Sequence, residues 1–593
     1  MLLNKKNRFI LLLFSLLICL ATSAWMYYLN EQQQLWGYLP LFQFSSLWAT
    51  IVLLWHPRFS KLPNKNQLMV AALGSGVLLW ASFPAMPTTF LIFFAFVPLL
   101  WVEASISKNT TDTAKWEVFK YSYLSFTVWN ILTTYWVGNT ALVAGLFAIF
   151  LSAAFMTIPF VLFHVTKKRL NEKLGYVSFI AYWISFEYVY LNQEVSWTWL
   201  NIGNCFGQYP SWVQWYEYTG VFGGALWALV ANVLAFHIWQ YYKRQHGFDT
   251  GNLIKLGLWI VVPMMGSLLL YMSHENRGPS VEVVVVQPNL EPHYVKFSLS
   301  PQEQLQRFVS LSEKGLTDST SYLVFPETSF NRINFSNVLT NRSILPIKAM
   351  VDRRPGLHLV TGISSVHEFT AEEAHGPAIR TYKRGDQTRY YEVANAAIQL
   401  TANSEEVPLY IKSKLVPGAE FLPYRQVFFF LKPLVRKLGG SMAGLATQEE
   451  RSNFSSDAGI VAPVICYESI YGAYTTDYVR KGANALFIIT NDGWWDNTAG
   501  HRQHLAYARL RAIETRRSIA RSANTGISCF INQRGDVRMA TAYDEPTVIR
   551  DQIQLNDEAT IYVKWGDLIA RVLGFLAILL FLNGFVKGLT RRK

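Results

Sequence analysis

Residues 253–272 read LIKLGLWIVVPMMGSLLLYM, and residues 280–289, a few positions later, read SVEVVVVQPN. The first stretch is long and apolar enough to cross a membrane as a helix, which requires about 20 mostly apolar residues. The second is a short β-branched run, which is typical of a buried strand. We therefore expect a helical membrane region before this point and an α/β domain after it.

Apolar runs with the composition of membrane helices continue in both directions from this point. The candidates are Phe9–Tyr28, Leu35–Trp55, Leu68–Phe83, Phe90–Val102, Val118–Val137, Ala141–Val165, Tyr176–Leu191, Val221–Tyr241, Leu253–Met272 and Leu568–Val586. The third and fourth are short and separated by prolines, so one or both could be re-entrant. The first resembles a removable leader, but no small-residue cleavage site separates it from the next run, so we expect it to remain. The predicted parts are a transmembrane domain at 1–277, a second domain at 278–562 and a final helix with a basic tail at 563–593.

Basic residues alternate between the loops of this region. They occur at the N-terminus and in every second loop: Lys5, Lys6 and Arg8; Arg58, Lys61 and Lys65; Lys108 and Lys115; Lys167, Lys168, Arg169 and Lys173; Lys243 and Arg244. The intervening loops, including 192–220, contain neither Lys nor Arg. Because basic loops stay in the cytoplasm, this pattern predicts a cytoplasmic N-terminus and places residues 278–562 outside the cytoplasm.

The net charge of +13 does not indicate a nucleic-acid partner. Residues 278–566 contain 31 Lys and Arg against 29 Asp and Glu, so the excess lies in the short clusters beside the apolar runs. That distribution is typical of membrane topology rather than of a nucleic-acid surface. The four cysteines form no CxxC pair or Cys/His cluster, so we expect no metal site.

From Ser280 onward, short apolar runs alternate with helix-like stretches. The expected strands are 281–286, 322–325, 357–361, 396–400, 461–466, 485–490 and 527–532, and the expected helices are 302–314, 471–482 and 502–519. This alternation predicts a layered α/β domain.

Three reactive side chains fall at the ends of short apolar runs or just after them, where α/β proteins usually build their sites. They are Glu327, Lys412 and Cys466. A thiol needs a base to become an effective nucleophile, a carboxylate can supply that base, and an ammonium can stabilise an oxyanion. The trio therefore suits attack on an ester or amide carbonyl to form a thioester.

Each of the three residues also has a simpler interpretation. Cys466 could be a buried apolar residue or could form a disulfide with Cys529, since a compartment outside the cytoplasm permits disulfides. Glu327 could be an acid in the first turn of a helix, and Lys412 a surface lysine beside Lys414.

Two apolar segments outside the trio suggest contact with lipid. Loop 192–220 is rich in aromatic residues, which favours an interfacial belt, with a lipid-lined mouth as the alternative. Glu187, near the outer end of its helix, either reaches the interface or has a functional role. Segment 427–437, which includes Phe428, Phe429 and Phe430, either packs on the domain or dips into the membrane to control lipid access.

Several motifs in one order resemble the nitrilase (carbon–nitrogen hydrolase) superfamily and, more closely, the bacterial apolipoprotein N-acyltransferases. The resemblance runs from about residue 68 to the end of the chain. The matching stretches are FPETS at 325–329, YIKSKLVPGAEF at 410–421, ICYE at 465–468, TNDGW at 490–494, QH at 503–504, ARLRAIE at 508–514, NTGI at 524–527, WLNIG at 199–203 and YWV at 135–137. The two runs before Leu68 look like an N-terminal addition without an assigned role.

The resemblance implies an αββα sandwich on a membrane bundle in the bacterial inner membrane, with the sandwich on the periplasmic side. Glu327 would be the general base, Lys412 the oxyanion-stabilising amine and Cys466 the nucleophile. Supporting residues would be Glu420, which would orient Lys412, together with Tyr467 and Glu468 beside the thiol. Trp494 and Trp199, with the three phenylalanines of segment 427–437, are candidates for lipid or substrate contact.

The implied reaction passes an acyl chain from a phospholipid, typically phosphatidylethanolamine, to Cys466 and then to the α-amine of the diacylglyceryl-cysteine of a lipoprotein. No cofactor is implied. Two other functions are compatible with parts of the sequence. A membrane-tethered amidase would not require so many spans, and a transporter with a degenerate sensor domain would not require the trio.

Overall fold

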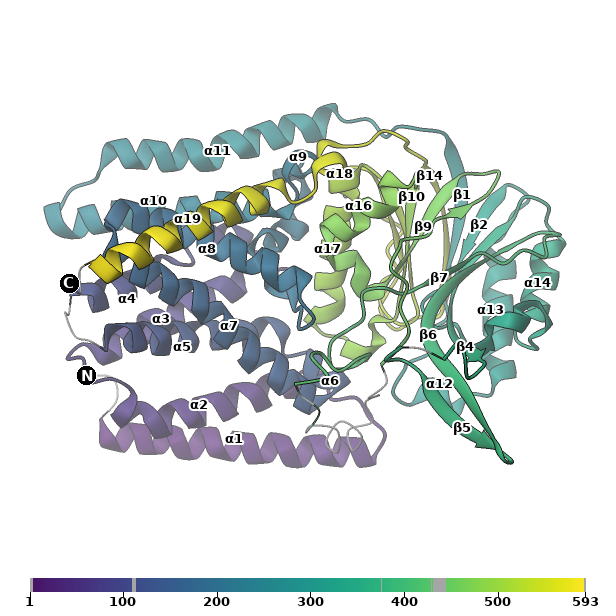
Figure 1. Ribbon diagram of the computed structural model, residues 1–593, viewed down its shortest axis with the longest axis horizontal. Coiled ribbons are helices and arrows are strands. Elements are labelled where there is room, and N and C mark those ends of the chain that lie inside the picture. Colours follow the sequence, from purple (N-terminus) through teal and green to yellow (C-terminus); the bar gives the residue numbers. More distant parts are fainter. Residues whose placement is uncertain (1–3, 109–112, 375, 428, 430–443, 591–593) are drawn as a thin grey trace.

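The computed structural model describes residues 4–108, 113–374, 376–427, 429 and 444–590. A bundle of long helices lies beside an α/β domain, and both chain ends lie at the end of the bundle far from that domain (Figure 1).

All ten apolar runs predicted from the sequence lie on helices. The long helices are α1 (Lys5–Glu31), α2 (Leu39–Phe59), α3 (Lys65–Ala81), α4 (Val97–Lys108), α5 (Ala114–Thr134), α7 (Leu142–Arg169), α8 (Glu172–Asn192), α10 (Val221–Gln245), α11 (Thr250–Ser273) and α19 (Leu568–Thr590). A 3₁₀ turn, η1 (Thr89–Phe93), precedes α4. Within the described residues, seven helical segments are long and apolar enough to cross a membrane: α1, α2, η1 with α4, α7, α10, α11 and α19. The chain is a multi-pass membrane protein.

The aromatic loop between α8 and α10 folds into short helices that lie between the bundle and the α/β domain. These are η2 (Thr198–Leu200), η3 (Ile202–Gln208), η4 (Pro210–Trp212) and α9 (Tyr216–Thr219). Trp197, Trp199 and Tyr216 are buried, so the interfacial belt expected for this loop is wrong for these rings. Glu187 is also buried among protein side chains. Its carboxylate accepts hydrogen bonds from Trp183 Nε1 (3.0 Å) and from the backbone N–H of Ile202 (2.9 Å), which tie the loop to α8.

The α/β domain contains two facing sheets. The first has the order β14-β1-β2-β4-β6-β5, with β3 also paired to β4 and β7 to β6. Its strands are β1 (Ser280–Gln287), β2 (Thr320–Val324), β3 (Phe330–Asn334), β4 (His358–Phe369), β5 (Arg380–Arg384), β6 (Gln387–Thr401), β7 (Leu409–Ile411) and β14 (Thr547–Gln554). The second has the order β13-β12-β11-β10-β9-β8. Its strands are β8 (Phe454–Ser455), β9 (Ile460–Ile465), β10 (Ala485–Thr490), β11 (Ser518–Ala523), β12 (Cys529–Ile531) and β13 (Val537–Arg538).

Helices cover the outer face of each sheet and complete an αββα sandwich. On the first sheet these are α13 (Pro301–Gly315) and α14 (Leu345–Asp352), and on the second α16 (Gly472–Arg480) and α17 (Ala499–Thr515). The valine run of β1 is buried on both faces, since Val283 and Val285 pack with the second sheet while Val284 and Val286 pack with α13. Burial on both faces explains why residues 283–286 are all valine.

One predicted helix ends earlier than expected. The stretch predicted as helical over 502–519 ends at Thr515, and the buried strand β11 starts at Ser518. Arg516 has a positive φ of 50°, which ends the helix. Buried arginines made the strand look polar: Arg517 donates to the carbonyl of Ala483 (2.7 Å), and Arg521 donates to Asp492 (2.6 Å).

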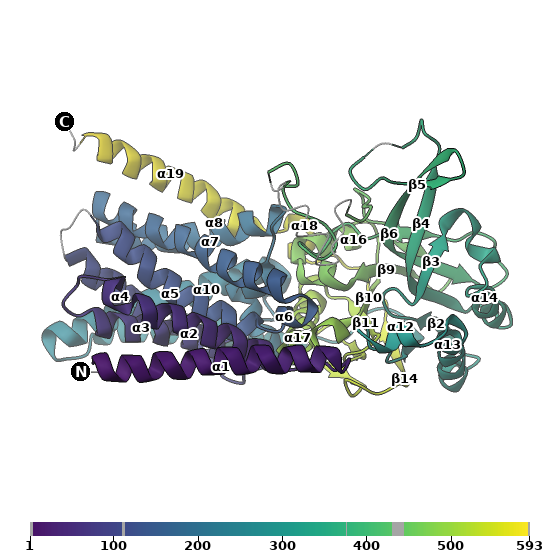
Figure 2. The same ribbon diagram turned by 90° about the horizontal axis from the view of Figure 1, so that it is seen from below.

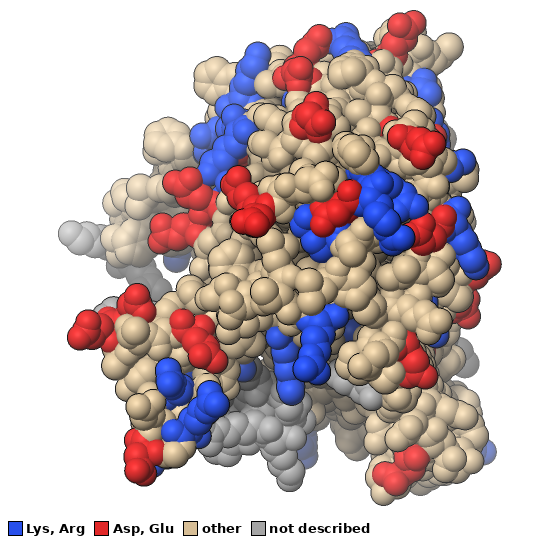
Figure 3. All heavy atoms as spheres, turned by 90° about the vertical axis from the view of Figure 1, so that its right-hand side faces the viewer, with Lys and Arg blue, Asp and Glu red and all other residues tan. Residues whose placement is uncertain are grey.

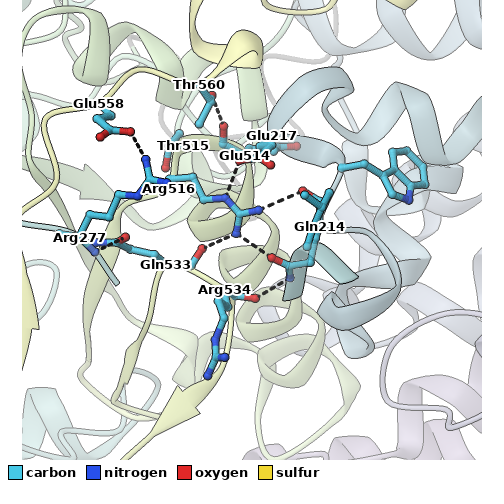
Figure 4. A network of polar contacts seen from close by, with 12 residues as sticks. Gln214, Glu217, Arg277, Glu514, Thr515, Arg516, Gln533, Arg534, Glu558 and Thr560 are labelled. Carbon is cyan, nitrogen blue, oxygen red and sulfur yellow. Dashed lines mark hydrogen bonds and ion pairs between the residues drawn. The ribbon is translucent and has the colours of Figure 1, made fainter. Parts of the chain in front are cut away.

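A polar network joins the α/β domain to the helical region at the end of α17 (Figure 4). The guanidinium of Arg516 donates to Glu217 (2.8 Å) and to Gln214 (2.6 Å), both in the loop before α10, and to the carbonyl of Gln533 (3.0 Å). Gln214 in turn donates to the carbonyl of Arg534 (2.9 Å). The loop before α10 is therefore bonded directly to the α/β domain.

Candidate active site

Cys466 lies at the point where β9 turns into the 3₁₀ helix η7 (Cys466–Ile470). Its backbone has a φ of +48°, which is uncommon for a residue with a side chain and concentrates at functional sites. Cys466 is buried and free, and so is Cys529, so the alternative of a disulfide between them is wrong for this structure.

The structure brings Glu327 and Lys412 together, each just after the end of a strand of the first sheet. Glu327 follows β2 and Lys412 follows β7. Lys412 Nζ lies 3.2 Å from Glu327 Oε1 and 2.9 Å from Glu420 Oε1, and the side chains of Lys412 and Glu327 are both buried. Asn395 on β6 holds the two acids in place, because its amide donates to Glu327 (2.7 Å) and to Glu420 (3.2 Å).

The charges of this cluster act on the thiol. Burial raises the pKa of Cys466, the Glu327 carboxylate raises it further, and the Lys412 ammonium opposes both. For Lys412, burial disfavours the ammonium, but Glu327 and Glu420 outweigh that effect and hold its pKa above the usual value. The arrangement therefore favours the ammonium form of Lys412 and the neutral form of the Cys466 thiol, and a thiol in that state would need a base to act as a nucleophile.

Glu468 connects the segment after Cys466 to the segment after Lys412. Its buried carboxylate accepts hydrogen bonds from the hydroxyls of Tyr410 and Tyr474 (both 2.6 Å) and from the backbone N–H of Ser413 (2.8 Å). It also accepts from the N–H of Ile465 (2.9 Å), the residue before the thiol. Glu468 thus holds together the segments that carry Lys412 and Cys466.

The predicted aromatic residues have different surroundings. Tyr467 points toward the loop before α10, where its hydroxyl donates to the carbonyl of Ser196 (2.9 Å). Trp199 is only 1% exposed and packs against the rings of Trp136 and Tyr507, so it contacts protein rather than lipid. Trp494 is 38% exposed.

Segment 427–437 is described in part. Phe429 is exposed, whereas Phe428, Phe430 and residues 431–437 lie outside the described residues, so the lipid-contact prediction for them stays a prediction.

Sequence reasoning did not identify a second layer of buried polar residues around the thiol. Asp492 and His504 lie in the motifs TNDGW and QH, but the sequence assigned neither residue a role. His504 Nδ1 lies 3.0 Å from Asp492 Oδ1, and His504 Nε2 lies 3.2 Å from the carbonyl oxygen of Cys466. Burial would raise the pKa of Asp492, but Arg521 and His504 outweigh it and lower the pKa. The available signal was the position of Asp492 just after the predicted strand 485–490.

Two further residues shape the position of Glu327. Lys296 in α12 (Val295–Ser298) is buried, and its Nζ donates to the carbonyl of Thr328 (2.7 Å). Burial lowers the pKa of Lys296 to about 8. Gly362 on β4 lets the chain approach closely, because a Cβ there would lie 2.6 Å from Glu327 Cα. Within the described residues, no group of three or more His, Cys, Asp or Glu side chains is placed to hold a metal ion.

The α/β half and the helical half each match a known family. Residues 283–562 match the carbon–nitrogen hydrolase family, and residues 75–234 match the apolipoprotein N-acyltransferase N-terminal domain. The chain is thus a carbon–nitrogen hydrolase-type enzyme built on a multi-pass membrane bundle.

Known proteins are similar in sequence to most of this chain, including both the helical half and the α/β half. The chain is 28% identical to the apolipoprotein N-acyltransferase of Chlorobaculum tepidum, over 85% of this chain and 94% of that protein. It is 25% identical to that of Geobacter metallireducens, over 87% and 94%. Among solved structures, Nit3 of Saccharomyces cerevisiae, from the nitrilase superfamily, aligns with 50% of this chain and 96% of its own at 14% identity and a TM-score of 0.34. The protein belongs to the apolipoprotein N-acyltransferase family.

Proposed function

We propose that the protein transfers an acyl chain from a phospholipid to Cys466 and then to the N-terminal α-amine of a diacylglyceryl-cysteine lipoprotein. The observation that carries the proposal is the buried cluster of Glu327, Lys412 and Glu420, whose charges act on the Cys466 thiol. Family membership supports the acyltransferase activity. Membrane helices adjoin the domain at both ends, which supports a lipid donor.

In the first half-reaction, Glu327 takes the thiol proton as sulfur attacks the ester carbonyl of the phospholipid. The ammonium of Lys412 stabilises the oxyanion, with Glu420 holding the lysine in place. The tetrahedral intermediate then breaks its carbon–oxygen bond. Glu327 returns the proton to the departing alkoxide, which leaves as a lysophospholipid, and the acyl chain remains on Cys466 as a thioester.

In the second half-reaction, the α-amine of the acceptor attacks the thioester carbonyl and Glu327 takes its proton. Collapse of the intermediate expels the Cys466 thiolate, which recovers that proton, and the product is an amide. The burial of Cys466 supports this partition toward the amine, because water must be kept from the thioester between the two steps.

The location of the α/β domain follows from the same proposal. We place it on the periplasmic side of the bacterial inner membrane, with the three parts divided at 1–277, 278–562 and 563–593. The alternation of basic loops supports this side. So does the position of both chain ends at the far end of the bundle (Figure 1). On the face of the α/β domain opposite the bundle, acidic and basic side chains of the described residues are intermixed (Figure 3).

Intact-mass spectrometry of the full-length protein tests the proposal. After incubation with phosphatidylethanolamine vesicles, the protein should gain the mass of one acyl chain, and addition of a diacylglyceryl-cysteine peptide should move that mass to the peptide. Cys529→Ala should behave like the wild type, whereas Cys466→Ala should gain nothing. An adduct that persists in Cys466→Ala, or none in the wild type, would overturn the proposal. Rapid loss of the acyl group to water without peptide would favour the amidase-type alternative.

A further inference from the structure

The helices α1 and α2 form a hairpin that lies outside both matched family ranges, which begin at residue 75. Figures 1 and 2 show the two helices side by side along one edge of the bundle, with their connecting turn next to α6 (Val137–Thr140). Helix α1 is little buried, with only Ser15 and Met26 buried among its described residues. Packing of the bundle core therefore does not account for α1.

The turn of the hairpin is bonded to a loop of the α/β domain. The backbone N–H of Gly37 donates to the Asp496 carboxylate (2.8 Å). The side-chain amide of Asn139 donates to the carbonyl of Gly37 (3.0 Å) and to the carbonyl of Trp495 (3.1 Å). One asparagine thus links the hairpin turn to the 3₁₀ helix η8 (Asp492–Trp495).

Tight packing fixes the hairpin against α6. A Cβ at Gly138 would lie 2.9 Å from Pro40 Cβ and 3.0 Å from a ring carbon of Phe44, so only glycine allows this approach. Phe44 is fully buried and belongs to the same apolar cluster as Cys466. The ring of Tyr38 stacks on Tyr135, with 5.7 Å between centroids.

The loop that the hairpin contacts leads directly to the nucleophile. At one end of η8, Asp492 holds His504, whose other ring nitrogen lies 3.2 Å from the carbonyl oxygen of Cys466. At the other end, the Trp495 ring packs against Trp136 and His504. Asp496, which accepts the hairpin's hydrogen bond, has a φ of +57°, a conformation that external contacts must stabilise.

We propose that the turn of the α1–α2 hairpin positions the η8 loop and thereby shapes the approach of the phospholipid donor to Cys466. The inference rests on the proposed acyl transfer but assigns the hairpin no chemical role. Because α1 and α2 have the length and composition of membrane helices, their turn is suited to link the loop beside the thiol to the lipid phase. Asn139 is the positioning residue through which the hairpin acts.

The test compares Asn139→Ala with Asn192→Ala in the full-length protein. Asn192 is a matched control, because its amide also donates to a backbone carbonyl, that of Tyr188 at 2.8 Å, but does not contact η8. Single-turnover thioester formation is measured against the concentration of phosphatidylethanolamine in mixed micelles. Hydrogen exchange is followed in peptides that cover residues 492–498.

For Asn139→Ala we expect the donor concentration at half-maximal rate to rise roughly 5- to 10-fold, as for loss of about one well-made hydrogen-bond link. The maximal rate should stay within about twofold, and residues 492–498 should exchange faster. Asp496→Ala, which removes the separate hydrogen bond from the Gly37 N–H, should change the half-maximal donor concentration in the same direction, and the double variant, which loses both links, should be affected more than either single variant. Asn192→Ala should match the wild type.

Two results would overturn the inference while leaving acyl transfer intact. One is an unchanged half-maximal concentration and unchanged exchange in Asn139→Ala. The other is a lower melting temperature with both kinetic parameters reduced alike, which indicates a role in stability alone. Absence of a thioester in the wild type would instead count against the proposed function itself.

Discussion

At the scale of single residues, Lys412 carries the positive charge on which the proposed reaction depends. Replacement by Met keeps most of the side-chain volume but removes the ammonium that lies 2.9–3.2 Å from two acids. Thioester formation should fall by at least 10²- to 10³-fold, as for loss of an oxyanion donor. Lys414→Met is the matched control, because Lys414 lies over the ring of Tyr471 and makes no ion pair with Glu327 or Glu420. The rate is measured by intact-mass spectrometry of samples quenched at successive times. Equal losses of rate in the two variants would contradict the role proposed for Lys412.

Replacement of Gly362 tests how precisely the backbone of Glu327 must be positioned. An added methyl group at Gly362 would lie within 2.6–2.7 Å of backbone atoms of Pro326, Glu327 and Thr328, so that loop must shift. Gly362→Ala should destabilise the protein by about 1–3 kcal/mol and lower the rate of thioester formation at least about 10-fold. Gly257→Ala, where a Cβ meets nothing within 4 Å, should change neither the rate nor the thermal melting curve. A normal rate in Gly362→Ala would mean that Glu327 tolerates displacement.

The sequence indicates candidate reactive residues more readily than the residues that hold them in place. Glu327, Lys412 and Cys466 follow short apolar runs, and their chemistry is unusual in such places. Asn395 lies inside a strand as one amide among alanines, and nothing local indicates that it bonds two acids about 70 and 25 residues away. Such partners depend on which strands become neighbours, here β6 beside β4 and β7.

At the scale of elements, Glu468 joins β7, β9 and α16 through one carboxylate. Glu468→Gln keeps the shape but replaces an acceptor of six hydrogen bonds by a group that must also donate. We expect a loss of about 2–4 kcal/mol in stability, because buried partners are left unsatisfied, and a slower reaction at Cys466. Thermal melting in detergent checks the first effect. Glu450→Gln, an exposed acid paired with Lys481, should be nearly neutral, and a similar shift in both variants would contradict the role of Glu468.

The boundaries of helices and strands could be predicted where the apolar pattern is strong. The prediction failed where charged side chains are buried, because in the sequence they look like exposed residues. The strands β1 and β10 begin and end within a residue of the expected runs. The predicted helix 502–519 included the first two residues of β11, because Arg517 is buried yet looks like an exposed helical arginine. The partners of Arg517 and of Arg521 in β11, Ala483 and Asp492, come from other elements. The pairing of β14 with β1 likewise joins residues about 270 positions apart.

At the scale of the whole molecule, the division into a membrane half and an α/β half followed from composition, but their contact did not. Loop 192–220 has the aromatic content of an interfacial belt, and buried protein interfaces have the same content. In the structure this loop receives hydrogen bonds from α17. Tyr507 donates to the carbonyl of Trp199 (2.6 Å), Arg509 to that of Gln208 (3.0 Å) and Arg516 to Gln214.

Glu514 offers a measurement of how firmly the two halves are joined. It is fully buried on α17, paired with Arg511, and its carboxylate lies beside the first backbone N–H of α10. Burial raises the pKa of Glu514 to about 7, and Arg511 opposes that shift only in part. A raised pKa means that the folded state binds this proton more tightly than the unfolded state. Glu514 therefore stabilises the fold below pH about 4.5, and this contribution is lost as the pH rises through 7.

Glu514→Gln should remove that pH dependence, because glutamine stays neutral at every pH in this range. The melting temperature of the variant relative to the wild type should therefore rise steadily between pH 5 and pH 8. The corresponding free-energy change is up to roughly 3 kcal/mol at about 1.4 kcal/mol per unit of pKa. Melting curves at pH 5, where the wild-type carboxyl is already protonated, are the internal control. A difference that stays constant or shrinks over this range would mean that the ionised Glu514–Arg511 pair, rather than a protonated carboxyl, joins α17 to the start of α10.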